Sequence, residues 1–244
     1  MIPYFFIGQF SIGQITIHVW GLFVALGIMC GTIFAAYRAS SRKIEQYIIV
    51  DLVFWTTLAS VIGAMIAFVL FNGKNETLGF SSIGAIIAGS ATVFVIAKIK
   101  KISISSLLDI LGPAVLLAEG IGRIGCFMLH EHLGKITGSV LGINIFGENR
   151  HDLGLYFSLA GFAGLFFVLM LERVWKKWAI GGIGAIAILW YLSWRFLLEF
   201  LLESNGPLAV EKIHGLTLMQ IFSIFVIIFI NWYFFPYVPA LRRF

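Results

Sequence analysis

Residues 17–37 read IHVWGLFVALGIMCGTIFAAY, without one Lys, Arg, Asp or Glu. An α-helix needs about 20 apolar residues to cross the ~30 Å of hydrocarbon in a bilayer. The apolar residues are continuous instead of alternating with polar ones, which favours a helix over a strand of a closed barrel. The same pattern recurs along the chain. It predicts seven transmembrane helices, at about residues 17–37, 48–71, 80–97, 107–130, 154–172, 180–203 and 215–235.

The composition of the whole chain agrees with a membrane protein. Of its 244 residues, 60% are hydrophobic and 12% are charged, and the mean hydropathy is +0.98. Soluble globular domains are roughly 45–50% apolar and about 25% charged. We therefore expect an all-α integral membrane protein that forms one polytopic domain over residues 1–244. No basic segment precedes the first apolar run, so we expect no cleaved signal peptide.

Lys and Arg are distributed unequally between the two sets of predicted loops. Loops on one side of the membrane carry 11 basic residues, whereas loops on the other side carry four. The positive-inside rule places the richer side in the cytoplasm. We therefore expect the N-terminus outside and the C-terminus in the cytoplasm. The 11 residues are Arg38, Arg42, Lys43, Lys98, Lys100, Lys101, Arg173, Lys176, Lys177, Arg242 and Arg243.

The net charge of +5 does not indicate a nucleic-acid-binding protein, because the basic residues lie in short loops and form no single run. Cys30 and Cys126 both lie in apolar runs, so we expect no structural disulfide. The cysteines and histidines match no metal-binding spacing. We therefore expect no metal, no cofactor and no nucleic-acid partner.

Polar residues gather toward the outer ends of the predicted helices. Arg123 and Arg195 lie inside predicted spans at similar depth, and each has an acid four residues away, Glu119 and Glu199. A charge inside a span is costly and by default marks a functional site. The planar guanidinium group suits phosphate oxygens, so the pattern indicates a phospholipid phosphate. The alternative is that these arginines hold helices together or extend to the headgroups.

The histidines follow the same asymmetry. All of them fall toward the outer side of the predicted membrane: His18, His130, His132, His151 and His214. Two acids lie at the opposite side, Asp51 and Asp109, each near the start of a helix that runs outward. The helix dipole favours negative charge at such a start. We therefore expect these two acids to be structural. Because the paired charges lie toward one face and form no path across the membrane, an ion channel or proton-coupled transporter is the weakest alternative.

The segment from Gly122 to Glu131 reads GRIGCFMLHE and is the most specific motif of the chain. Its glycines, Gly122 and Gly125, either let helices pack closely or leave room for a ligand. The segment resembles the signature GRIGNFxNxE of the prolipoprotein diacylglyceryl transferases, a family of bacterial membrane enzymes. Arg123 and Glu131 stand at the arginine and the glutamate of that signature.

Further segments resemble the same family in the same order along the chain. Residues 18–22 are similar to its HWYGL, and residues 109–113 to the aspartate and proline that precede the signature. Residues 150–156 resemble RHPSQLYE, residues 194–200 resemble RFxxEF, and residues 215–220 resemble GLTxGQ. The resemblance therefore extends over nearly the whole chain, and the family's seven-helix topology with the N-terminus outside agrees with the charge distribution.

The chain departs from the family pattern at several positions. Ile83 stands where the family's SxHGG segment has a histidine implicated in catalysis. The other departures are Cys126 and Leu129 for two asparagines, Asp152 for a proline, Phe157 for a glutamate and Met219 for a glycine. Two readings stay open. The protein is a divergent active enzyme, or it is a paralogue that binds phospholipid without this activity or uses a different acceptor.

The resemblance implies transfer of a diacylglyceryl group from phosphatidylglycerol to the lipobox cysteine of prolipoproteins, with release of glycerol 1-phosphate. It implies a multi-pass protein of the bacterial cell membrane, with a site toward the outer leaflet. The implied partners are phosphatidylglycerol, the prolipoprotein signal peptide and membrane lipids.

The resemblance also assigns roles to residues. The two arginines would bind the lipid phosphate, with Glu199 and Glu131 orienting them. The catalytic candidates are Arg123, Arg195, Glu199, Glu131 and His18. The candidates for binding phosphatidylglycerol are Arg123, Arg195, Tyr156, Trp20, Gly122 and Gly125. The candidates for proton transfer are His130 and His151.

Overall fold

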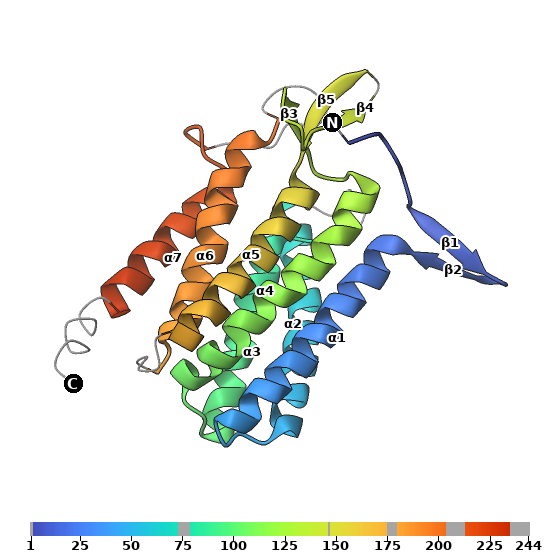
Figure 1. Cartoon of the computed structure of the whole chain (residues 1–244). Helices are drawn as coiled ribbons and strands as arrows, with labels where there is room; N and C mark the ends of the chain where they lie inside the picture. Colours follow the sequence, from blue (N-terminus) through green and yellow to red (C-terminus); the bar gives the residue numbers. More distant parts are fainter. Residues whose placement is uncertain (1, 73–78, 146, 175–179, 204–212, 235–244) are drawn as a thin grey trace.

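A computed structural model describes residues 2–72, 79–145, 147–174, 180–203 and 213–234. Most of these residues form a bundle of helices, with a small sheet at one end and a hairpin beside it (Figure 1). The helices are α1 (Val19–Ser41), α2 (Gln46–Asn72), α3 (Ser82–Lys100), α4 (Ile104–Leu129), α5 (Leu153–Val174), α6 (Gly182–Leu198) and α7 (Leu218–Phe234). The strands are β1 (Gln9–Ile12), β2 (Ile15–His18), β3 (Leu133–Ile136), β4 (Ile143–Ile145) and β5 (Glu148–Asp152).

The helices occur where the apolar runs predict them. Six of them are long and apolar enough to cross a membrane, and α7 is a shorter apolar helix. Their ends differ from the expected ones by a few residues. The α6 helix ends at Leu198 and continues as a 3-10 turn, η1 (Glu199–Leu201). The α1 helix extends past its apolar run to Ser41, and Arg38 in this added turn pairs with the Glu172 carboxylate of α5 at 2.8 Å.

The α4 helix lies at the centre of the bundle and packs against α1, α5 and α6, whereas α2 packs mainly against α3 (Figure 1). The approach of α1 to α4 depends on small residues. A Cβ atom at Gly27 would lie 2.6 Å from the carbonyl oxygen of Ala118, and one at Gly31 would lie 3.1 Å from that of Ala114. Such close backbone contact is typical of helix pairs in membranes.

Asp109 joins three elements at the end of the bundle where α4 begins. Its buried carboxylate accepts hydrogen bonds from the Gly181 and Gly184 amides at the start of α6, at 2.8 and 2.9 Å. It also accepts one from Arg42 at 2.8 Å. Asp109 therefore caps the start of α6 and not that of its own helix, α4. Asp51, at the corresponding place in α2, is exposed.

A small sheet, which we call the head, covers the opposite end of the bundle. Its strands are antiparallel in the order β3-β5-β4. The β1–β2 hairpin projects from the start of α1 and is exposed (Figure 1). The sequence predicts none of these strands. The strands of the head are three to five residues long and lie in a segment that reads as a loop, whereas Ile17 and His18 at the end of β2 lie where the first helix was predicted to begin.

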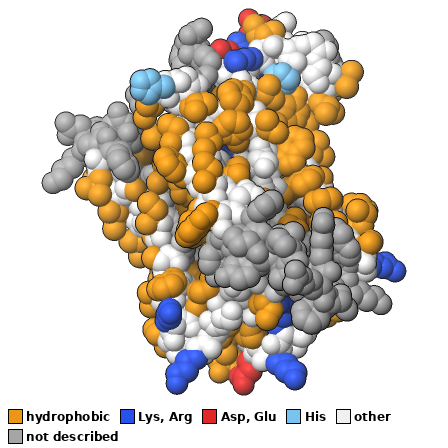
Figure 2. Space-filling model, turned by 90° about the vertical axis from the view of Figure 1, so that its left-hand side faces the viewer, with side chains coloured by type: hydrophobic (Ala, Val, Ile, Leu, Met, Phe, Trp, Pro, Cys, Tyr) orange, Lys and Arg blue, Asp and Glu red, His pale blue; other side chains and the backbone are white. Residues whose placement is uncertain are grey.

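The flank of the bundle is apolar. Large hydrophobic side chains are exposed along its helices, such as Ile33 at 64%, Phe54 at 61% and Phe166 at 71%. Figure 2 shows hydrophobic side chains over the side of the molecule, with charged side chains at both ends, Lys and Arg spread along the lower end and histidine at the upper end. A soluble protein does not leave so much apolar surface in water. The chain is a multi-pass membrane protein.

Candidate active site

Two arginines near the head are each paired with a carboxylate four residues away in the chain. Arg123 of α4 donates from Nε to Glu119 at 2.7 Å. Arg195 of α6 donates from Nε to Glu199 at 2.8 Å. Both expected pairs are therefore present. Within the described residues, these bonds hold each guanidinium through Nε alone, so its terminal nitrogens remain available for an anion.

Phe157 of α5 brings the two pairs into one site. The guanidinium carbon of Arg123 lies 5.0 Å from the centroid of the Phe157 ring, and that of Arg195 lies 4.8 Å from it. The ring is buried. Cation–π contacts of this kind orient a guanidinium without neutralising its charge. Phe157 stands at one of the departures from the family pattern, so an aromatic face replaces an acid between two arginines.

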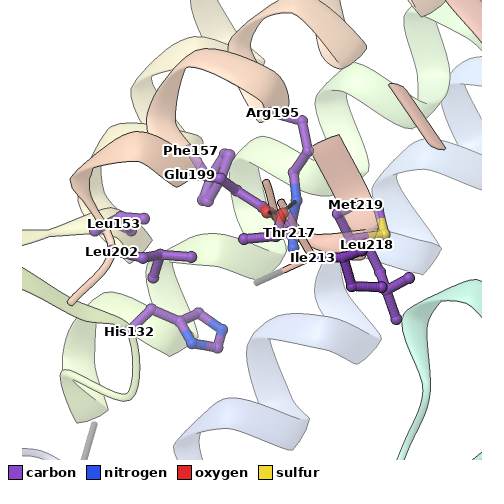
Figure 3. Close-up of a pocket in the computed structure, with 10 residues that line it drawn as sticks. All are labelled: His132, Leu153, Phe157, Arg195, Glu199, Leu202, Ile213, Thr217, Leu218 and Met219. Carbon is purple, nitrogen blue, oxygen red and sulfur yellow. Dashed lines mark hydrogen bonds and ion pairs between the residues drawn. The ribbon is translucent and has the colours of Figure 1, made fainter. Parts of the chain in front are cut away.

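A cavity of about 340 Å³ opens beside Arg195. Figure 3 shows the Arg195 guanidinium and the Glu199 carboxylate together on one side of it, with the His132 ring on the other. Its lining is mostly apolar. The lining residues are His132, Leu153, Phe157, Arg195, Glu199, Leu202, Ile213, Thr217, Leu218 and Met219.

The start of α7 fixes Glu199 from the other side of this cavity. Thr217 and Gln220 form a capping box, in which the Thr217 amide donates to the Gln220 side chain and the Gln220 amide donates to the Thr217 hydroxyl. That same hydroxyl donates to Glu199. The local sequence TLMQ therefore begins the helix and also orients the carboxylate that holds Arg195.

A second cavity, of about 370 Å³, opens beside Arg123. Its lining residues are Trp20, Val24, Ile28, Val115, Ala118, Glu119, Gly122, Arg123, Cys126 and His132. The two glycines of the motif divide the roles expected of them. A Cβ atom at Gly125 would lie 3.0 Å from Phe23 and 3.1 Å from Trp20, whereas one at Gly122 would meet nothing within 4 Å. Gly125 thus permits close packing, and Gly122 leaves room beside Arg123.

His132 lies between the two cavities. It is the residue common to their linings in the described part of the chain. Burial and, after it, the positive charges of Arg123 and Arg195 lower the pKa of its imidazole to about 4. The ring is therefore neutral at physiological pH. The sequence places His132 among the outer histidines. Its position between Arg123 and Arg195 could not be predicted from the neighbouring residues, because it depends on how the helices pack.

The other candidate histidines lie elsewhere. His18 is exposed at the end of the β1–β2 hairpin. His130 is buried in the head, where it contacts Asp152 at 2.7 Å and the Phe5 carbonyl at 2.5 Å. Both ring nitrogens of His130 are therefore occupied within the head. His151 contacts the Tyr156 hydroxyl at 2.8 Å.

The structure therefore divides the candidates in two. It brings Arg123, Arg195, Glu199, Trp20 and Gly122 to the cavity linings. Gly125 packs behind them. It does not bring the remaining candidates to either lining within the described residues: Glu131, His18, Tyr156, His130 and His151. Glu131 is exposed in the segment that follows α4.

Comparison with known proteins identifies the family. Residues 8–235 match the family model described as prolipoprotein diacylglyceryl transferase. The chain belongs to the prolipoprotein diacylglyceryl transferase family. A relative from Listeria monocytogenes serotype 4b is 30% identical over 90% of this chain and 87% of its own length. One from Staphylococcus xylosus is 31% identical over 89% and 85%, and one from Pediococcus pentosaceus is 28% identical over 78% and 77%.

The three relatives are named phosphatidylglycerol–prolipoprotein diacylglyceryl transferases. Family membership confirms the resemblance found in the sequence. In this member, Asp152 is fully buried against His130, so the acid that replaces a proline has gained a partner inside the head. Ile83 lies in the first turn of α3 and lines neither cavity within the described residues.

Proposed function

We propose that this protein transfers the diacylglyceryl group of phosphatidylglycerol to the lipobox cysteine of prolipoproteins. The observation that carries the proposal is the convergence of Arg123 and Arg195 on the Phe157 ring, with a cavity beside each guanidinium. Family membership supplies the class of reaction. Two forked cations beside largely apolar cavities suit a ligand with one phosphate and two acyl chains.

The reaction requires stabilisation of the negative charge that develops on the leaving phosphate. The cysteine sulfur attacks the glycerol carbon that carries the phosphate ester, a carbon–sulfur bond forms, and the carbon–oxygen bond breaks. The electron pair of the broken bond leaves with the phosphate of glycerol 1-phosphate. Arginines placed at that phosphate stabilise the growing negative charge in a site of low dielectric constant. Glu199 keeps Arg195 in position and, like Glu119, leaves the terminal nitrogens free for the lipid.

We propose further that all seven helices cross the membrane and that the head faces outward. The excess of Lys and Arg at the end opposite the head supports this orientation. The site then lies toward the outer leaflet, where secreted precursors emerge. Fusion of a fluorescent protein after the last residue should give fluorescent cells. Fusion of a phosphatase that is active only outside the cytoplasm should give cells without phosphatase activity. The reverse pattern would overturn the orientation.

The proposed activity can be tested in cells. In a bacterium depleted of its own prolipoprotein diacylglyceryl transferase, expression of this protein should restore growth and the lipid-dependent gel shift of a reporter lipoprotein. A reporter with serine in place of the lipobox cysteine is the control and should not shift. Lack of rescue, with the protein present in the membrane at wild-type levels, would count against the proposal.

Phe157→Leu should weaken phospholipid retention while leaving the fold intact. Leucine keeps the position apolar but removes the ring that both guanidinium groups contact. Each such contact contributes on the order of 0.5–1 kcal/mol, and the variant loses two of them. We expect the affinity for phosphatidylglycerol, measured by titration in micelles, to fall roughly five- to thirtyfold. Less phosphatidylglycerol should therefore be retained after purification. Phe166→Leu is the control, because Phe166 lies on the same helix with its ring exposed. Equal retention by the two variants would contradict the role given to Phe157.

A further inference from the structure

The residue that lines both cavities is a histidine, which can accept a proton. His132 lies in the short segment between the end of α4 and the start of β3. Figure 3 shows its ring facing the cavity from the side opposite Arg195 and Glu199. A group in this position is within reach of a lipid phosphate held by the arginines and of a thiol brought beside it. Neither arginine can take a proton, since a guanidinium stays protonated in proteins.

The two carboxylates at the site are already engaged, and the other histidines are either engaged or lie away from the cavities. The carboxylate of Glu119 holds Arg123, and that of Glu199 holds Arg195 and accepts from Thr217. His130 is bound at both ring nitrogens, and His151 contacts Tyr156. His18 and His214 are exposed. Among the described histidines, His132 is the one that lines a cavity.

We propose that His132 is the general base that removes the proton from the acceptor cysteine. This inference rests on the proposed function. The thiol proton passes to a ring nitrogen of neutral His132, and the thiolate attacks the glycerol carbon of the lipid. The carbon–oxygen bond breaks, and the phosphate leaves as a dianion. The imidazolium then returns its proton to that phosphate, so that atoms and charge balance. In this chain His132 would supply the base, so the isoleucine at position 83, where the family has a histidine, does not prevent the reaction.

The charges around His132 couple its basicity to lipid binding. In the free protein, burial and the facing charges of Arg123 and Arg195 lower its pKa to about 4, while a hydrogen bond to the Glu131 backbone and the charge of Glu119 act in the opposite direction. A phosphodiester bound to the arginines places a negative charge beside them. This charge offsets the positive field and raises the pKa of His132 toward its ordinary value. The base is therefore strengthened when the lipid is present.

The variants His132→Gln and His132→Asn test the proposal in purified protein with phosphatidylglycerol micelles and a lipobox peptide. We expect turnover at pH 7 to fall at least about 100-fold, as is typical for loss of a general base. Retention of phosphatidylglycerol should stay within about twofold of wild type. The ratio of wild-type to variant turnover should fall more than about tenfold between pH 7 and pH 9.5, because a free thiol ionises near pH 8.5 without the help of a base. His214→Asn is the matched control and should retain wild-type turnover.

A deficit that stays constant with pH would mean that His132 only shapes the site, and wild-type turnover in both variants would also overturn the proposal. An inactive wild-type protein would instead defeat the proposed function, so the two failures are distinguishable.

The pH dependence of the wild-type enzyme supplies a second test, which needs no variant. The acid limb of kcat should lie at higher pH than that of kcat/KM for phosphatidylglycerol, because the first reports the lipid complex and the second the free enzyme. Coincident limbs would contradict the coupling.

Discussion

Arg123→Gln is expected to lower the rate of transfer at least about 100-fold. Removal of a single preorganised donor to a developing negative charge typically costs this much, and here a full positive charge is removed as well. Glutamine keeps much of the length of the side chain but neither the charge nor the fork that binds two phosphate oxygens. Retained phosphatidylglycerol should fall together with the rate. The measurement is glycerol phosphate release per enzyme, with lipid content determined by mass spectrometry.

Two companion variants make this result specific. Arg123→Lys keeps the charge but loses the planar fork, so it should recover only a part of the activity. Arg150→Gln removes an arginine in the head that pairs with Glu148 and Glu203 and lines neither cavity within the described residues. It should stay within a few-fold of wild type. Full lipid retention by the Arg123→Gln protein would show that the phosphate is bound elsewhere.

Asp109→Ala is expected to destabilise the protein more than any other substitution considered. The change leaves the buried Gly181 and Gly184 amides without an acceptor and removes the partner of Arg42. Breaking a buried ion pair by removing one partner typically costs about 3–5 kcal/mol. The midpoint of thermal unfolding in detergent, followed by tryptophan fluorescence, should therefore drop by several degrees or more.

The matched control for that variant is Asp51→Ala. Asp51 is the sixth residue of α2, as Asp109 is of α4, but its side chain is exposed. Its replacement should leave the unfolding midpoint within about a degree of wild type, since surface substitutions usually change stability by less than about 0.5 kcal/mol. Equal midpoints for the two variants would mean that the contact between Asp109 and the start of α6 contributes little.

The helices could be predicted from the sequence because the bilayer imposes a simple constraint. A continuous apolar run of sufficient length, such as residues 17–37, has few other solutions in lipid. The two pairs of Arg and Glu could be predicted because each lies within one predicted span, where residues four apart share a helix face. These features depend on local spacing, which the sequence displays directly.

The head and the centre of the site could not be predicted in the same way. Strands as short as Ile143–Ile145 carry too little alternation to be distinguished from a loop. The contact of Phe157 with two arginines depends on how α4, α5 and α6 pack, and the position of His132 depends on the fold of the head. Such relations join residues far apart in the chain. A single sequence reveals them only through a family pattern, and Phe157 departs from that pattern.

The most direct test of the proposed function is turnover by the purified wild-type protein. The assay combines phosphatidylglycerol micelles with a lipobox peptide and records glycerol phosphate release together with the mass of the peptide. A peptide with serine in place of cysteine, and micelles with phosphatidylethanolamine in place of phosphatidylglycerol, are the controls. We predict release only with the cysteine peptide and phosphatidylglycerol, and a mass gain of one diacylglyceryl group. Phosphatidylglycerol that stays bound while neither product forms would contradict the proposal and would indicate a phospholipid-binding member of the family.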